Sequence, residues 1–374
     1  MNRRFLFLLS VFVLAGSPVI AQEDSAEDVL DVLDVLAENP GRFSLVVYSL
    51  DDPDSGIYHH ANVMRPLATT VKILVLAEYA RRVAERTLDP EELVPLDSVE
   101  TYYFPGTDRG AHEEAVTELR DAGRLANGEL SLGDIADAMI RYNDNAAADY
   151  LMLRFGREAM DALPQLLDER YAEAPVPISG IYLNWDLPYN ITDDATNLPD
   201  QDEDRAWMLS QRMRAGENFS DDMGLWMAGM NTRMSYGELS AAALAFPAGS
   251  TRAYAGMMGK AFRGELISEE VSEIMFDILD YEMDDASIRV GFDQLLATKS
   301  GSLAGIITST YVADGKPLFA GGFDAGPTVL ALFIESLPSD VFERWLASDD
   351  LVVFEQRLLT DPVYMETVRE RLGE

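Results

Sequence analysis

Residues 69–83 read Thr-Thr-Val-Lys-Ile-Leu-Val-Leu-Ala-Glu-Tyr-Ala-Arg-Arg-Val. The nearly unbroken apolar run from Ile73 to Ala77 predicts a central, buried helix, because a helix that is apolar on most of its faces belongs in a core. Thr69 and Lys72 lie at the start of this helix, three residues apart and therefore on one helical face. These two side chains are the first candidates for a functional site.

Strand patterns lie near both ends of the chain. They cover residues 43–50, 56–61, 294–313 and 328–334, with a turn at Asp314-Gly315-Lys316-Pro317. Helical patterns cover residues 24–38, 131–139, 145–155 and 340–372, and the segment from Asp89 to about Ala248 is mainly helical. Strands that come early and late, with helices between them, predict a sheet that the two chain ends complete.

The predicted fold class is α/β in the α+β sense. An antiparallel sheet is flanked by N- and C-terminal helices, and an all-α domain is inserted in the middle. The predicted domains are residues 22–88 together with 250–374 for the sheet, and residues 89–249 for the helices.

The first 21 residues predict a signal peptide. A basic start, Asn2-Arg3-Arg4, precedes an apolar run from Phe5 to Ala15, and small residues lead to Ala21. The alternative is an uncleaved anchor, for which the run is short. We expect cleavage after Ala21 and an exported protein, periplasmic or secreted, without a stable membrane span.

The composition excludes several classes of function. The chain has 374 residues, with 65 acidic and 29 basic side chains and a formal net charge of −36. Nucleic acids and anionic membranes require clustered Lys and Arg, so neither is an expected partner. The chain has no Cys and three His, which removes disulfides and thiol chemistry. We expect no metal, no cofactor and a monomer.

We expect different environments for the three histidines. His59 and His60 lie on a predicted strand edge and are expected to form a surface pair. His112 follows the loop at residues 105–110, and it either lines the site or has an ordinary loop role.

Lys72 gives the predicted helix a chemical role. An ammonium inside an apolar core is costly, so its pKa falls and it can accept the proton of the Thr69 hydroxyl. The alternative is structural, because Thr-x-x-Lys on a helix also occurs as an N-cap followed by a Lys that reaches solvent.

Two further polar segments accompany the first. Tyr142-Asn143-Asp144-Asn145 separates two predicted helices, and Lys299-Ser300-Gly301-Ser302 lies inside a predicted strand. Gly in a strand lets a ligand approach the backbone closely, and a Lys provides a fixed charge for an anionic substrate. Each segment alone is an ordinary turn or bulge.

In this order, the three segments resemble Ser-x-x-Lys, Ser-Asp-Asn and Lys-Thr-Gly, the motifs of class A β-lactamases and penicillin-binding proteins. Pro66-Leu67-Ala68 before the first segment and residues 145–148 in the second agree with this family, and the resemblance extends from about Phe43 to Leu337. It implies that Thr69 is the nucleophile and Lys72 the base. It also implies an oxyanion hole at the backbone N–H groups of Thr69 and Ser302.

The resemblance further assigns the polar residues around this pair. It implies that Lys299 and Ser300 hold a substrate carboxylate beside Gly301, and that Asp144 and Asn145 organise the cleft. The catalytic candidates are thus Thr69, Lys72, Asn143 and Lys299. The substrate-binding candidates are Asp144, Asn145, Ser300, Gly301, Ser302 and Asn184.

Three positions depart from the family pattern. Thr69 replaces Ser, and its methyl group restricts χ1. Asn143 replaces a Ser that relays a proton, which an amide does not do in the same way. Gly180-Ile181-Tyr182-Leu183-Asn184 aligns with Glu-x-x-Leu-Asn, so Gly180 stands where the family has the Glu that activates water. Asp186 is a nearby carboxylate.

The resemblance implies a hydrolase that acts by covalent acyl transfer on a β-lactam or a related amide or ester, with weak or altered deacylation. The alternative is a catalytically silent protein of the same fold that binds a cell-wall peptide or another anionic ligand. A third possibility is an esterase or peptidase with a substrate other than a β-lactam.

Overall fold

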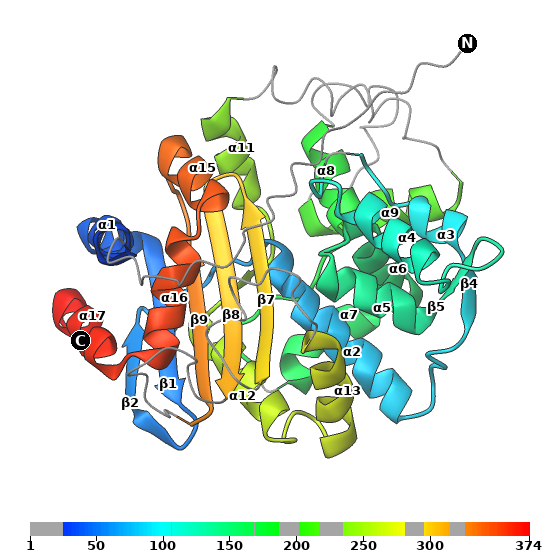
Figure 1. Ribbon diagram of the computed structural model, residues 1–374. Helices are drawn as coiled ribbons and strands as arrows, with labels where there is room; N and C mark the ends of the chain where they lie inside the picture. Colours follow the sequence, from blue (N-terminus) through cyan, green and yellow to red (C-terminus); the bar gives the residue numbers. More distant parts are fainter. Residues whose placement is uncertain are drawn as a thin grey trace, which may run out of the picture.

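The computed structural model describes residues 25–105, 107–167, 169–186, 202–216, 235–280, 295–314 and 326–374. At its centre lies a five-stranded antiparallel sheet with the strand order β2-β1-β9-β8-β7 (Figure 1). The strands are β1 (Phe43–Ser49), β2 (Asp52–His59), β7 (Leu295–Leu303), β8 (Ile306–Asp314) and β9 (Thr328–Ile334). Because β1 pairs with β9, early and late strands form one sheet, which confirms the predicted fold class.

Helices from both chain ends cover one face of the sheet. They are α1 (Ser25–Glu38), α15 (Ser339–Ala347), α16 (Asp350–Thr360) and α17 (Pro362–Leu372). Strand β1 alternates as a half-buried strand should: Leu45 and Val47 join the core beneath these helices, whereas Val46 joins the core on the opposite face. That second face carries α12 (Thr251–Phe262), which packs against α13 (Glu269–Leu279), and α13 in turn packs against α2 (Lys72–Ala84).

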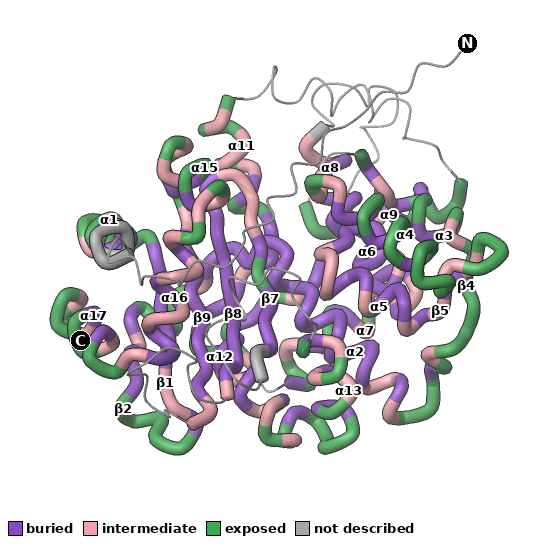
Figure 2. Tube along the Cα trace, viewed as in Figure 1, coloured by how far each residue is buried: buried purple, intermediate pink, exposed green. Residues whose placement is uncertain are grey.

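A mainly helical part follows α2. It contains α3 (Leu96–Glu100), α4 (Ala111–Asp121), α5 (Leu132–Arg141), α6 (Asn145–Phe155), α7 (Arg157–Leu166), α8 (Ile178–Asp186), α9 (Asp202–Arg214) and the short pair β4 (Leu93–Pro95) and β5 (Glu129–Ser131). Figure 2 shows that α6 lies buried among these helices. Helix α5 begins with a capping box formed by Ser131 and Asp134.

Short connections link the helical part to the sheet. Strand β3 (Arg65–Pro66) pairs with β6 (Ala248–Gly249), so the segments before and after the helices meet. Helix α11 (Tyr236–Ala243) packs beside α15, where the rings of Tyr236 and Phe342 are 6.1 Å apart. The division into residues 22–88 with 250–374 and residues 89–249 stays a prediction.

Two local features differ from the sequence prediction. The strand predicted over residues 294–313 is a hairpin, because Ala304 and Gly305 form a turn in which Gly305 has φ +76°. The helix predicted from Thr69 begins as a 3₁₀ turn, η2 (Ala68–Val71), before α2 starts at Lys72. The rest of the predicted turn at residues 314–317 lies outside the described residues.

Within the described ranges, no helix is long and apolar enough to cross a membrane. The predicted signal peptide lies outside the described residues.

Candidate active site

Strand β7 and the turn η2 lie unusually close together. A Cβ on Gly301 would be 2.7 Å from the backbone N of Thr69 and 2.9 Å from its Oγ1, so only glycine lets the strand lie there. Ala68, just before Thr69, has φ +48°, a left-handed conformation that costs a non-glycine residue about 1–3 kcal/mol. Packing against β7 therefore holds the Thr69 turn in a strained conformation.

Asn143 joins the three polar segments. Its Nδ2 donates to Thr69 Oγ1 at 2.9 Å, and its Oδ1 accepts from Lys299 Nζ at 2.7 Å and from Lys72 Nζ at 3.2 Å. Asn143 has φ +69°, a conformation that asparagine tolerates better than most residues. Thr69, Lys72, Asn143, Lys299 and Gly301 thus form one group, which we call the Thr69 cluster.

Both lysines of the Thr69 cluster are buried. Lys72 Nζ donates to the backbone O of Asn143 at 2.6 Å and to Asn145 Oδ1 at 2.8 Å. Burial lowers the pKa of Lys72 to about 7, against the opposing effect of Asp144 and other carboxylates. Burial and the charge of Lys72 also lower the pKa of Lys299 well below its usual range. Near neutral pH, Lys72 therefore exists in both its charged and its neutral form.

The hydroxyl of Thr69 is held by groups other than Lys72. Thr69 Oγ1 donates to the backbone O of Ser300 at 3.3 Å and accepts from Asn143. Lys72 donates instead to Asn143 and Asn145, so a proton transfer from Thr69 to Lys72 requires one of the two side chains to move. Catalytic hydrogen bonds of this kind often tighten only when the substrate is bound.

The remaining predicted site residues occupy different surroundings. On the edge strand β7, Ser300 is exposed and Ser302 is half-buried, whereas Thr69 is 6% exposed. Asn184 Nδ2 donates to Asp202 at 3.1 Å, and its Oδ1 accepts from Arg205 at 2.9 Å. Helix α9 thus engages the side chain of Asn184.

Asp144, next to the Thr69 cluster, connects helix α6 to helix α4. It caps α6 by accepting from Ala147 N at 3.1 Å, and its Oδ2 lies 2.8 Å from His112 Nδ1. Burial alone would lower the pKa of His112, but the hydrogen bond and charge of Asp144 raise it. His112 lies in α4 and stacks on Tyr103 at 4.3 Å. No sequence pattern indicated the His112–Asp144 pair, since 32 residues separate the partners.

Gly180 lies where helices α8 and α9 touch. A Cβ there would be 2.0 Å from Ala206 O and 2.7 Å from Ser210 Oγ, so no side chain fits. The buried Asp149 anchors the start of α8 by accepting from Ile178 N at 2.7 Å and Ser179 N at 2.6 Å. No sequence pattern marked Asp149 as part of this contact; burial raises its pKa to about 6. The side chain of Asp186 lies outside the described residues.

The prediction that His59 and His60 form a surface pair is wrong for His59. His59 is 5% exposed, with Nδ1 3.0 Å from Glu374 Oε1 and Nε2 3.0 Å from Pro40 O, whereas His60 is exposed. The sequence could not reveal this environment, because helix α17 brings Glu374 to His59 from the other end of the chain. In the described part of the chain, no group of three or more His, Asp or Glu side chains is arranged to hold a metal ion.

Sequence comparison matches residues 26–176 to the model described as Beta-lactamase enzyme family. The chain is 28% identical over 158 residues to Beta-lactamase SME-1 of Serratia marcescens, an alignment that covers 41% of this chain and 48% of that protein. The match therefore spans about half the length of this curated relative.

Structural comparison shows the same fold over most of the chain. A β-lactamase from Sphaerobacter thermophilus DSM 20745 superposes with a TM-score of 0.55 at 17% identity, covering 89% of this chain and 96% of that one. A PBP-A mutant in an acyl-enzyme complex with penicillin G gives 0.51 at 14% identity, with coverages of 88% and 95%.

A variant of the class A β-lactamase of the last common ancestor of Gram-negative bacteria gives a TM-score of 0.53 at 15% identity, with coverages of 91% and 99%. The chain thus has the fold of the class A β-lactamases and of PBP-A, and its residues 26–176 are similar to the β-lactamase enzyme family.

Proposed function

We propose that this chain is an acyl-transfer enzyme that attacks a β-lactam, or a related amide or ester, through the hydroxyl of Thr69. The observation that carries the proposal is the position of Thr69 Oγ1, 2.9 Å from Asn143 Nδ2, in a cluster with two buried lysines of lowered pKa. The acyl-enzyme complex of PBP-A with penicillin G, formed on the same fold, supports this chemistry.

In the proposed reaction, the neutral amine of Lys72 takes the proton of Thr69 Oγ1 as the oxygen attacks the carbonyl carbon. The backbone N–H groups of Thr69 and Ser302 stabilise the oxyanion. The carbon–nitrogen bond then breaks, and the Lys72 ammonium returns the proton to the leaving nitrogen. Asn143 orients Thr69 and both lysines but relays no proton, because its amide has none to exchange in this role. Lys299 binds the substrate carboxylate.

We further propose that the acyl group leaves slowly. The family carries a water-activating Glu at the position of Gly180, and here the backbone of α9 occupies the space of any side chain. A general base contributes about 10²–10⁴-fold to such a step. The acylated form of Thr69 is therefore expected to accumulate.

The second candidate function is non-covalent binding of an anionic ligand by the two lysines. The observation that favours it is that Lys72 donates to Asn143 and Asn145 and makes no hydrogen bond with Thr69. In this case, the Thr69 cluster recognises a carboxylate without forming a covalent bond.

Intact-protein mass spectrometry after incubation with penicillin G separates the two candidates. In the wild-type protein we expect a stable adduct that maps to Thr69. Thr69→Val keeps the shape of the side chain but lacks the hydroxyl, so it should form no adduct. Thr69→Ser should be acylated faster than the wild type. Saturable binding without an adduct in the wild-type protein would favour the binding protein. An adduct of equal yield in Thr69→Val would remove Thr69 from the mechanism.

We also propose that the protein is exported as a monomer after cleavage behind Ala21. The mass of the protein recovered from the periplasm of an expression host tests the cleavage point. A mass that includes residues 1–21 would contradict it.

A further inference from the structure

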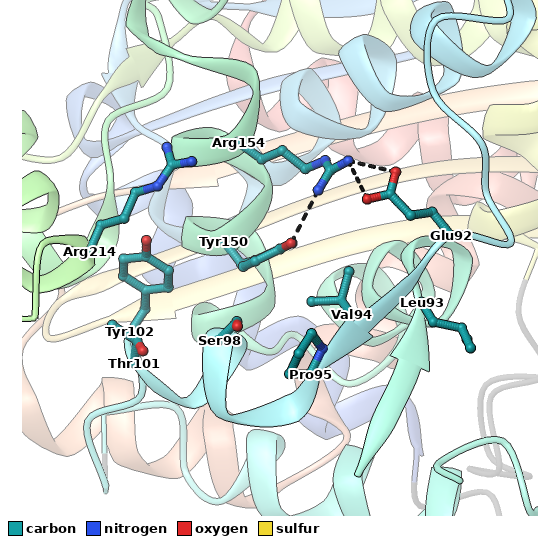
Figure 3. Close-up of a pocket in the computed structure, with 10 residues that line it drawn as sticks. All are labelled: Glu92, Leu93, Val94, Pro95, Ser98, Thr101, Tyr102, Tyr150, Arg154 and Arg214. Atoms are coloured by element: carbon teal, nitrogen blue, oxygen red, sulfur yellow. Dashed lines mark hydrogen bonds and ion pairs between the residues drawn. The ribbon is translucent and has the colours of Figure 1, made fainter. Parts of the chain in front are cut away.

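A cavity of about 380 Å³ lies in the helical part of the protein (Figure 3). Its walls come from β4, α3, the second half of α6 and the end of α9. No member of the Thr69 cluster lines it. Its volume lies in the range of cavities that hold small organic ligands.

The two arginines of this cavity differ in their pairing. Arg154 donates to both carboxylate oxygens of Glu92, at 2.8 and 2.7 Å, so its charge is neutralised. Arg214 donates to the backbone O of Leu153 at 2.8 Å and has no carboxylate partner among the described residues. One guanidinium therefore gives the cavity a net positive charge, in a chain whose own charge is −36.

Tyr102 supplies a second free donor next to Arg214. Its side chain is 4% exposed, and its hydroxyl forms no hydrogen bond within the described ranges. Figure 3 shows the Tyr102 hydroxyl on the same side of the cavity as Arg214, away from the pair of Arg154 and Glu92. Burial raises the pKa of Tyr102 to about 12, so the hydroxyl keeps its proton at neutral pH. Because Tyr102 lines the cavity, its hydroxyl can donate a hydrogen bond to a ligand there.

We propose that this cavity binds a small organic carboxylate, whose oxygens accept hydrogen bonds from Arg214 and from the hydroxyl of Tyr102. The planar guanidinium matches a carboxylate, and Val94 and Pro95 provide an apolar wall for the body of the ligand. A monoanion fits better than a phosphate dianion, because a single guanidinium is unpaired and Glu92 lines the same cavity.

Calorimetric titration of the full-length protein with sodium benzoate at pH 7 and low ionic strength tests the site. We expect saturable binding that Arg214→Gln weakens about tenfold and Tyr102→Phe by a smaller factor. Arg120→Gln, which removes the same charge from an exposed position on α4, serves as the matched control and should bind like the wild type.

Binding that is equal in Arg214→Gln and Arg120→Gln would place benzoate elsewhere, for example at Lys72 and Lys299, and would overturn the proposal. Absence of saturable binding would overturn it as well. Inorganic phosphate that binds as tightly as benzoate would overturn the assignment to an organic carboxylate. Thr69→Val should leave benzoate binding unchanged, so this test is independent of acylation.

Discussion

Substituting Gly180 by Glu tests whether a missing carboxylate alone explains the expected slow deacylation. A Cβ at this position lies 2.0 Å from Ala206 O, whereas ordinary van der Waals contact begins at 3.4 Å. The α8 and α9 backbones would have to separate by the difference, 1.4 Å, at a point where Asp149 fixes the start of α8. Overpacking of this kind costs about 1–3 kcal/mol. We expect Gly180→Glu to lose at least that much free energy of unfolding and to gain no deacylation.

Urea unfolding and the decay of the penicillin adduct, followed by mass spectrometry, measure the two effects. Gly180→Ala isolates the steric part, because its Cβ meets the same backbone, and should be nearly as destabilising as Gly180→Glu. Gly237→Glu is the matched control, since the Cβ of Gly237 in α11 meets no atom closer than 4.0 Å. A Gly180→Glu protein as stable as the Gly237→Glu protein, with faster loss of the adduct, would refute the steric reasoning.

Three further predictions follow from the Thr69 cluster and from the core under the terminal helices. Gly301→Ala should slow acylation about 100-fold at unchanged far-UV circular dichroism, because its Cβ pushes β7 away from Thr69. The acylation rate should rise with pH through about 7, where Lys72 becomes neutral, and a flat profile from pH 5 to 9 would exclude Lys72 as the base. Glu355 is a buried residue of α16, its carboxylate accepts a hydrogen bond from Tyr311 at 2.9 Å, and burial raises its pKa from 4.5 to about 7. Between these values the folded state keeps a proton that the unfolded state has lost, so stability should fall by about 3 kcal/mol as pH rises, and Glu355→Gln should remove this fall in urea titrations.

The sequence predicted elements best where polar residues mark both ends. Helix α6 spans Asn145–Phe155 as expected, because Asp144 caps its start and Gly156, with φ +88°, ends it. The turn at Ala304 and Gly305 was missed because a single glycine between apolar residues also occurs inside a strand. A hairpin and a long strand have the same alternation until the pairing is known.

The sequence likewise predicted some features of the candidate site and not others. The spacing of Thr69 and Lys72 predicted their common helical face, and the motif order pointed to the fold. Neither indicated that Asn143 would contact Thr69 and both lysines at once, because these contacts link positions more than 70 residues apart. The environments of His59 and His112 also depend on partners outside their local sequence, Glu374 and Asp144, so residue type alone could not distinguish buried from exposed histidines.

Two glycines act in opposite directions on the proposed reaction. Gly301 lets β7 approach Thr69, which assembles the groups needed for acylation. Gly180 lets α9 approach α8, which removes the space for a base that would complete hydrolysis. Because Asp149 anchors α8 and the closest contact is the backbone of Ala206, a carboxylate at position 180 requires α9 itself to move away from α8. In the proposed reaction, acylation and deacylation therefore depend on separate packing contacts, and we expect a single substitution at one contact to leave the other intact.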